Sequence, residues 1–303
     1  MPNFDHAPSL KDLLAGAHLP AMPQSAIRIM NVAQNPDNGP VEFAAPIEAD
    51  PGLTGQVLRF VNSSYFGFSR EISSVRHATT LVGVRTIKNF VLWSAVFSLV
   101  PNPKSGPFDL KSLWQDSLRR GLFARRLGRI LGLRDSEDAF SGALLQDMAV
   151  PLLAKELPQE YNGLLLERKG RAVRLSTLER ECFGWDHAEA AGLMARAWGL
   201  PERFADMIED HLDLERHLAN VANDPQRLAV ALSAFLPSIT CERWEEREIF
   251  DEAYAAVRGD GPTAEALLAE VDESFAEFAP LLKLSTPSRS LARHYEEAAA
   301  VFA

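Results

Sequence analysis

The sequence predicts an all-α protein, and three observations carry this prediction. Apolar residues recur at three- and four-residue spacing in nearly every segment, as in helices that bury one face. Prolines and capping residues fall where such segments begin or end. No strand-like alternation of useful length occurs, and no internal repeat is visible.

The first hundred residues predict five short helices. Asn35-Pro36 and Asp50-Pro51 are stop signals, because the residue before a proline disfavours the helical conformation. The fifth helix is apolar on nearly all sides, so we expect it to be central and buried. The first expected helix begins after Pro23 and ends at about residue 34, and the other four span 41–49, 53–61, 75–82 and 87–99.

A loop at 101–107, rich in proline, predicts a boundary between two lobes. Asp109 then looks like the N-cap of a long helix to about Leu131. Small residues along one stripe of that helix, such as Gly121 and Gly128, would let another helix approach closely. Further helices are expected over 137–153, 159–169, 176–182, 187–198, 201–212, 225–236 and 267–278, with a charged segment at 242–258.

We therefore divide the chain into an N-terminal segment (1–18), a main domain (19–236) with lobes at about 19–100 and 108–236, and a C-terminal helical extension (237–303). The net charge of −10 argues against a nucleic-acid partner or an anionic membrane. Cys182 and Cys241 cannot form a disulfide framework, and we see no signal peptide, so we expect a cytoplasmic protein. The most apolar run, 90–100, is too short to span a bilayer.

Several short motifs follow one another along the chain. They are Leu19-Pro20-Ala21-Met22-Pro23, Asp50-Pro51, Asn62-Ser63-Ser64-Tyr65-Phe66-Gly67, Ala143-Leu144-Leu145 followed by Asp147, the run 183–189, and Trp198-Gly199-Leu200-Pro201. In this order they resemble one known family, the HDOD domain, over roughly residues 15–236. The resemblance implies a multi-helix fold with an N-terminal helical bundle and a second bundle like that of the HD-type metal-dependent phosphohydrolases. It also implies a bacterial regulatory setting.

HD-type enzymes hold divalent metals with a distant His, a contiguous His-Asp pair and a later Asp, and related signalling hydrolases add two His residues. The resemblance places these slots at Asp116, at Gln146 with Asp147, and near 232–234, with His187 and His211 as further candidates. Glutamine is a poor ligand for a catalytic divalent metal, and no carboxylate lies between 228 and 236. We expect a degenerate HD site without metal or cofactor, whose polar groups bond between helices, and a degenerate metal site stays open as the alternative.

A basic cluster on the long predicted helix consists of Arg119, Arg120, Arg125, Arg126 and Arg129. The simplest interpretation is a solvated face with ion pairs to acidic residues. A surface for an acidic protein partner or a phosphate-containing ligand is the second interpretation, and nucleic acid is the third.

The run Asn62 to Gly67 combines turn formers with two aromatic residues. Asn62 can bond nearby backbone to shape a turn, and Tyr65 and Phe66 can fill the gap between helices. We expect this motif, including Ser63, to be structural, with an exposed aromatic knob for a partner as the alternative.

The expected function is that of a non-enzymatic signal-transduction module that acts through protein–protein contacts with an unnamed partner. Two alternatives stay open: a metal-dependent phosphohydrolase with an altered ligand set, and a small-molecule sensor that binds between the lobes.

Overall fold

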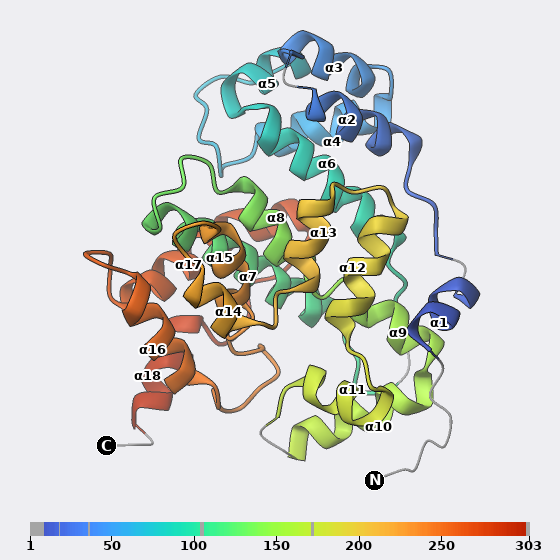
Figure 1. Ribbon diagram of the computed structural model, residues 1–303. Coiled ribbons are helices and arrows are strands. Elements are labelled where there is room, and N and C mark those ends of the chain that lie inside the picture. Colours follow the sequence, from blue (N-terminus) through green and yellow to red (C-terminus); the bar gives the residue numbers. More distant parts are fainter. Residues whose placement is uncertain (1–8, 18, 36, 104–105, 171–172, 301–303) are drawn as a thin grey trace.

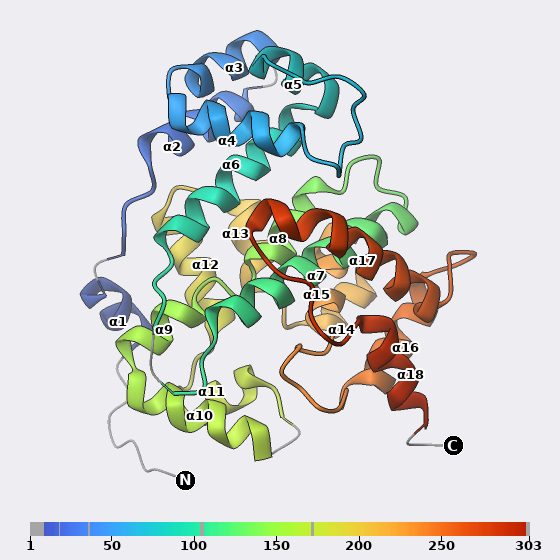
Figure 2. The ribbon, with the colours of Figure 1, turned by 180° about the vertical axis from the view of Figure 1, so that it is seen from behind.

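The computed structural model describes residues 9–17, 19–35, 37–103, 106–170 and 173–300 (Figures 1 and 2). Within these ranges the chain forms α-helices and one short 3₁₀-helix and has no strand, so the all-α prediction is confirmed. No described helix is long and apolar enough to cross a bilayer. Parts of the expected N-terminal segment (1–8 and 18), the loop between the lobes (104–105) and the extension (301–303) lie outside the described residues.

The N-terminal lobe lies at one end of the molecule, and its last helix leads into the larger body (Figure 1). The helix before the predicted stop at Asn35-Pro36 ends at Gln34, and Pro36 itself lies outside the described residues. The stop signal at 50–51 acts as predicted: Asp50 caps the fourth helix, because its carboxylate accepts from the Leu53 amide at 3.1 Å, and Pro51 takes the first turn. An additional helix before this lobe, α1 (Leu10–Gly16), was not predicted and packs against α12 (His187–Ala197) of the body. The helices of this lobe are α2 (Gln24–Gln34), α3 (Pro40–Glu48), α4 (Pro51–Val61), α5 (Val75–Val82) and α6 (Val84–Leu99).

Helix α7 (Leu110–Ile130) is the central helix of the body. It packs against α8 (Glu137–Leu145), α15 (Pro225–Ser233) and α17 (Ala264–Phe278). A Cβ atom on Gly121 would lie 3.0 Å from the Phe140 carbonyl oxygen, so the small-residue stripe does admit a close neighbour, α8. The other helices of the body are α8 (Glu137–Leu145), α9 (Val150–Glu156), α10 (Pro158–Gly170), α11 (Leu175–Phe183), α12 (His187–Ala197), α13 (Glu202–Glu209), α14 (Leu214–Ala219) and α15 (Pro225–Ser233).

The single helix expected over 137–153 is wrong, because the structure has two helices, α8 and α9, with a turn at 146–149 between them. Pro151 supplies the physical reason. A proline inside a helix lacks an N–H and its ring collides with the carbonyl four residues earlier, which here belongs to Asp147. The chain therefore turns at Asp147 and restarts as α9 with Pro151 near its first turn.

The C-terminal extension packs onto the body. Helix α17 lies against α7, and α18, which was not predicted, lies against α17 (Figure 2). Phe278, at the end of α17, is fully buried, and its ring contacts Phe60 and Tyr65 of the N-terminal lobe and Phe140 of the body. One apolar core therefore runs through both lobes and the extension. The elements of the extension are α16 (Arg247–Val257), α17 (Ala264–Phe278), η1 (Ala279–Leu282) and α18 (Leu291–Ala300).

Candidate functional site

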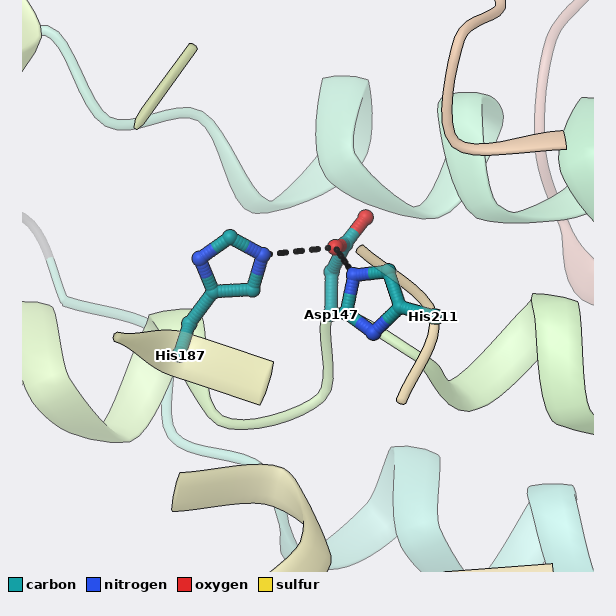
Figure 3. Close-up of side chains that lie close together, drawn as sticks. All are labelled: Asp147, His187 and His211. Carbon is teal, nitrogen blue, oxygen red and sulfur yellow. Dashed lines mark ion pairs between the residues drawn. The ribbon is translucent and has the colours of Figure 1, made fainter. Parts of the chain in front are cut away.

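Three buried side chains from separate parts of the body converge on one point (Figure 3). Asp147 comes from the turn between α8 and α9, His187 is the first residue of α12, and His211 follows α13. The Asp147 Oδ1 atom lies 3.3 Å from His187 Nε2 and 3.7 Å from His211 Nε2. One ligand-type atom from each residue lies within 4.8 Å of the other two. The structure thus brings together three of the predicted HD-site positions.

Partners outside this cluster orient both imidazole rings. His187 Nδ1 lies 2.6 Å from a Glu179 carboxylate oxygen, and the Tyr161 hydroxyl donates to the other oxygen at 2.6 Å. His211 Nδ1 lies 2.6 Å from the Ile208 carbonyl oxygen. Because each Nδ1 is used in this way, Nε2 is the nitrogen that faces the Asp147 carboxylate. Burial, as the largest cause, places the pKa of His211 well below its usual value, so this ring is neutral at physiological pH.

A positively charged side chain, Arg120, also contacts the Asp147 carboxylate. The Arg120 guanidinium of α7 forms an ion pair with Asp147 Oδ2, the oxygen that does not face the histidines. The Arg120 side chain is 13% exposed and that of Asp147 is 8% exposed. Burial lowers the pKa of Arg120, but a guanidinium starts so high that it stays charged.

Asp116 is not part of the cluster, although it occupies the first HD slot. Its carboxylate accepts from the Ser238 hydroxyl at 2.5 Å and from the Ile239 amide at 2.9 Å. Burial raises the pKa of Asp116, and the nearby charge of Arg120 opposes this shift. The residue therefore fastens α7 to the segment that leaves α15.

Gln146 is fully buried and contacts the position where the later Asp of an HD site is expected. Its side-chain oxygen lies 3.3 Å from the Ser233 hydroxyl of α15. That hydroxyl also lies 2.6 Å from the Val230 carbonyl oxygen, as a donor. Two positions that the resemblance assigns to metal ligands of an HD enzyme are thus neutral groups in contact with each other.

A match to a protein-family model identifies the family of this chain. The model of the HDOD domain family matches residues 19–214. This chain belongs to the HDOD family. An uncharacterised protein of Treponema pallidum (strain Nichols) is 26% identical over 197 residues, which is 65% of this chain and 38% of that protein. The chain thus spans well under half the length of that relative.

Solved structures share the fold of this HDOD protein. An HDOD domain protein of unknown function from Geobacter sulfurreducens has a TM-score of 0.69 at 22% identity, over 89% of this chain and 94% of that one. A proposed phosphohydrolase from Shewanella amazonensis SB2B has a TM-score of 0.62 at 19% identity, over 97% and 99%. A proposed signal transduction protein from Marinobacter aquaeolei VT8 has a TM-score of 0.58 at 18% identity, over 93% and 65%.

At the HD slots that the resemblance implies, this HDOD domain differs from the metal centre of HD enzymes, although Asp147, His187 and His211 converge. Such a centre needs several carboxylate and imidazole ligands that leave open positions for water. Here Gln146 replaces a ligand, Asp116 is bound elsewhere, and the second oxygen of Asp147 faces a permanent positive charge. A divalent cation at this point would meet the Arg120 guanidinium.

The interpretation of the arginine cluster as a solvated face is wrong for Arg119 and Arg125, which are buried, but the expected ion pairs with acidic residues are present. Arg119 is 1% exposed and Arg125 is 5% exposed, and Arg120 points to Asp147. Arg129 is exposed. The reason is that the extension, which the sequence places outside the resemblance, covers much of α7.

Four of the five arginines, Arg119, Arg120, Arg125 and Arg126, have partners within the described chain. Arg119 donates to the Arg289 carbonyl oxygen before α18, and Arg126 pairs with Glu270 of α17. Arg125 pairs with Glu137 at 2.9 Å, and its guanidinium lies 3.9 Å from the centre of the Phe140 ring. These contacts tie the extension and α8 to α7.

The Asn62–Gly67 motif lies against the body and shapes its own loop. The Asn62 amide donates to the Ile72 carbonyl at 2.7 Å and accepts from the Ile72 amide at 2.7 Å, which closes the loop between α4 and α5. Tyr65 accepts from Arg125, and Phe66 packs edge-on against Phe60 at 5.0 Å. Gly67 has a φ of 63°, a conformation that favours glycine.

Sequence reasoning missed Glu179 and Tyr161. Glu179 is fully buried in α11, on the stripe that also carries Leu175 and Leu178. An acidic residue on an apolar stripe is a signal for a buried polar partner, because an unpaired buried carboxylate is costly. That signal could have pointed to His187.

Proposed function

We propose that this HDOD protein is a signal-transduction module that acts through contacts with other proteins and does not hydrolyse phosphoesters. One observation carries the proposal: the buried contact between Gln146 and Ser233, at two positions where an HD enzyme needs ligands. Hydrolysis of this type requires a metal-bound water as nucleophile, and neutral side chains in contact with each other offer it no place.

The remaining HD-site residues support the same proposal, because each has a structural partner. Asp116 accepts a hydrogen bond from the Ser238 hydroxyl, and the His211 ring lies in hydrogen-bond contact with the Ile208 carbonyl oxygen. Such a network fixes the ends of several helices around α7. A helical body that is tied together in this way is suited to presenting surfaces to partners. One fold relative carries a proposed signal-transduction role, which agrees with this proposal.

A hydrolysis assay tests the enzymatic half of the proposal. The purified chain is incubated with Mn²⁺, Fe²⁺ or Zn²⁺ and with phosphodiester and phosphomonoester substrates. We expect no turnover above that of the folded Asp147→Asn variant. Turnover by the wild-type chain that Asp147→Asn abolishes would contradict the proposal.

Co-purification from the source cells under gentle cross-linking tests the interaction half. We expect a protein recovered at a fixed ratio to the chain, and the recovered complex should re-form from its purified components. If no protein is recovered and a metabolite extract raises the unfolding temperature, the small-molecule sensor replaces this proposal.

A further inference from the structure

The Arg120 guanidinium lies against a cluster that otherwise has the form of a metal-ligand set. We infer that Arg120 is a built-in substitute for a metal ion, and that removing it alone turns Asp147, His187 and His211 into a divalent-metal site. The inference deepens the proposed function at the same site and rests on it in one respect: the wild-type site is taken to be free of metal.

The ligand geometry is already in place for this change. Both histidines present Nε2 to Asp147 Oδ1, at 3.3 and 3.7 Å, and their atoms lie within 4.8 Å of one another. A Glu179 carboxylate behind His187 and a backbone carbonyl behind His211 are the outer partners that orient histidine ligands in metal sites. Two imidazoles and one carboxylate suit a first-row transition metal, with water at the open positions.

The guanidinium explains why the wild-type chain would not use these ligands. It pairs with Asp147 Oδ2 in a place with little solvent to screen its charge. An ammonium could lose its proton to make room for a metal, but a guanidinium does not. A divalent cation would therefore face a fixed positive charge and lose part of the Asp147 carboxylate to it.

The position of Arg120 also indicates a role at the centre of the network. Asp116, one turn earlier on α7, adds negative charge near the guanidinium. The Arg120 charge thus interacts with both Asp116 and Asp147. The charges of Arg168, Arg174 and Glu246 also act on the guanidinium. A metal ion interacts with the carboxylates of the site in an HD enzyme.

Cobalt titration tests the inference, because Co²⁺ reports nitrogen and oxygen ligation in its visible spectrum. Wild type, Arg120→Ala and the matched control Arg126→Ala are compared, since Arg126 lies on the same helix but pairs with Glu270 at the surface. We expect one Co²⁺ per chain in Arg120→Ala only, with a higher unfolding temperature on binding. Adding Asp147→Asn should abolish the site, and adding Glu179→Gln should weaken it about 10- to 100-fold.

Two variants keep the test decisive if Arg120→Ala folds poorly. Arg120→Met keeps the apolar stem of the side chain, and it should bind Co²⁺ in the same way. If neither variant folds alone, Co²⁺ added before refolding should restore the fold, because it replaces the missing charge. Failure of Co²⁺ to do so overturns the inference.

The outcomes separate this inference from the proposed function. Folded Arg120→Ala without a Co²⁺ site would overturn the inference and leave the proposed function standing. Tight stoichiometric Co²⁺ binding by the wild-type chain at Asp147 would also overturn it. Phosphoester hydrolysis by wild type would instead overturn the proposed function.

Discussion

His294 is a buried titratable residue that lies outside the HD-site network. It is 1% exposed on α18, and neither ring nitrogen has a hydrogen-bond partner among the described residues. Burial, together with the positive charges of Arg289 and Arg119, lowers the pKa of His294 to about 4. The folded chain therefore favours the neutral form of the His294 ring.

This lowered pKa predicts a stability that depends on pH. The unfolded chain keeps a His pKa near 6.5, so it binds the proton first as the pH falls. Stability is fully present above pH 6.5, and up to about 3 kcal/mol is lost between 6.5 and 4. Urea unfolding at several pH values measures this loss.

The matched variants for this prediction are His294→Phe and His77→Phe. His294→Phe should flatten the dependence between pH 6.5 and 4. His77→Phe makes the same substitution at an exposed position. An equal slope in wild type and His294→Phe would show that other groups cause the acid sensitivity.

At this residue scale, the sequence predicted the identities at the site better than their roles. Asp147, His187 and His211 do meet, because the order of motifs follows the order of helices in the family fold. The ion pair between Arg120 and Asp147 could not be predicted. A helix with five arginines has the pattern of a solvated face unless the segment that covers it is known. Sequence distance alone could not place Ser233 beside Gln146.

Helix packing around α7 depends on glycine at one point of closest approach. A Cβ atom on Gly121 would lie 3.0 Å from the Phe140 carbonyl oxygen and 3.1 Å from its ring, and a backbone oxygen cannot move aside. Gly121→Ala should therefore lower the free energy of unfolding by about 1–3 kcal/mol, despite the better helix propensity of alanine.

Gly163 provides the control for this prediction, because it lies in α10 with nothing within 4 Å of the added Cβ atom. Gly163→Ala should leave stability unchanged or raise it by up to about 1 kcal/mol. Denaturant unfolding of both variants checks the pair. A Gly121→Ala protein as stable as Gly163→Ala would mean that α7 and α8 can separate without cost.

The elements themselves were largely predictable, and the failures have local causes. Prolines and caps marked the ends of α3, α4 and α7 to within one or two residues. The turn between α8 and α9 was not predicted because apolar residues continue through it at helical spacing. Pro151 was the one signal in the sequence that a helix ends there. Helix α18 was missed because its apolar face is short and depends on α17 for burial.

On the scale of the whole molecule, Phe278 joins the N-terminal lobe, the body and the extension. Its ring centre lies 4.9 Å from that of Tyr65, 5.6 Å from Phe140 and 6.0 Å from Phe60. Phe278→Ala should destabilise the chain by about 3–5 kcal/mol, because it opens a cavity where the three parts meet. Hydrogen exchange of residues 62–67 should rise at the same time.

Phe68 is the control, since it stacks on Phe66 nearby but is 38% exposed. Phe68→Ala should cost less than about 1 kcal/mol and leave exchange elsewhere unchanged. If Phe278→Ala left the 62–67 exchange at its wild-type rate, the extension would not support the N-terminal lobe.

If Arg120 takes the place of a metal ion, the wild-type body needs no metal for its stability. Metal analysis of the wild-type chain, purified without chelator or affinity metal, measures this. We expect far less than one iron, manganese or zinc ion per chain and an unfolding temperature that a chelator does not change. A stoichiometric metal ion, whose removal lowers the unfolding temperature and whose binding is lost in Asp147→Asn, would contradict it.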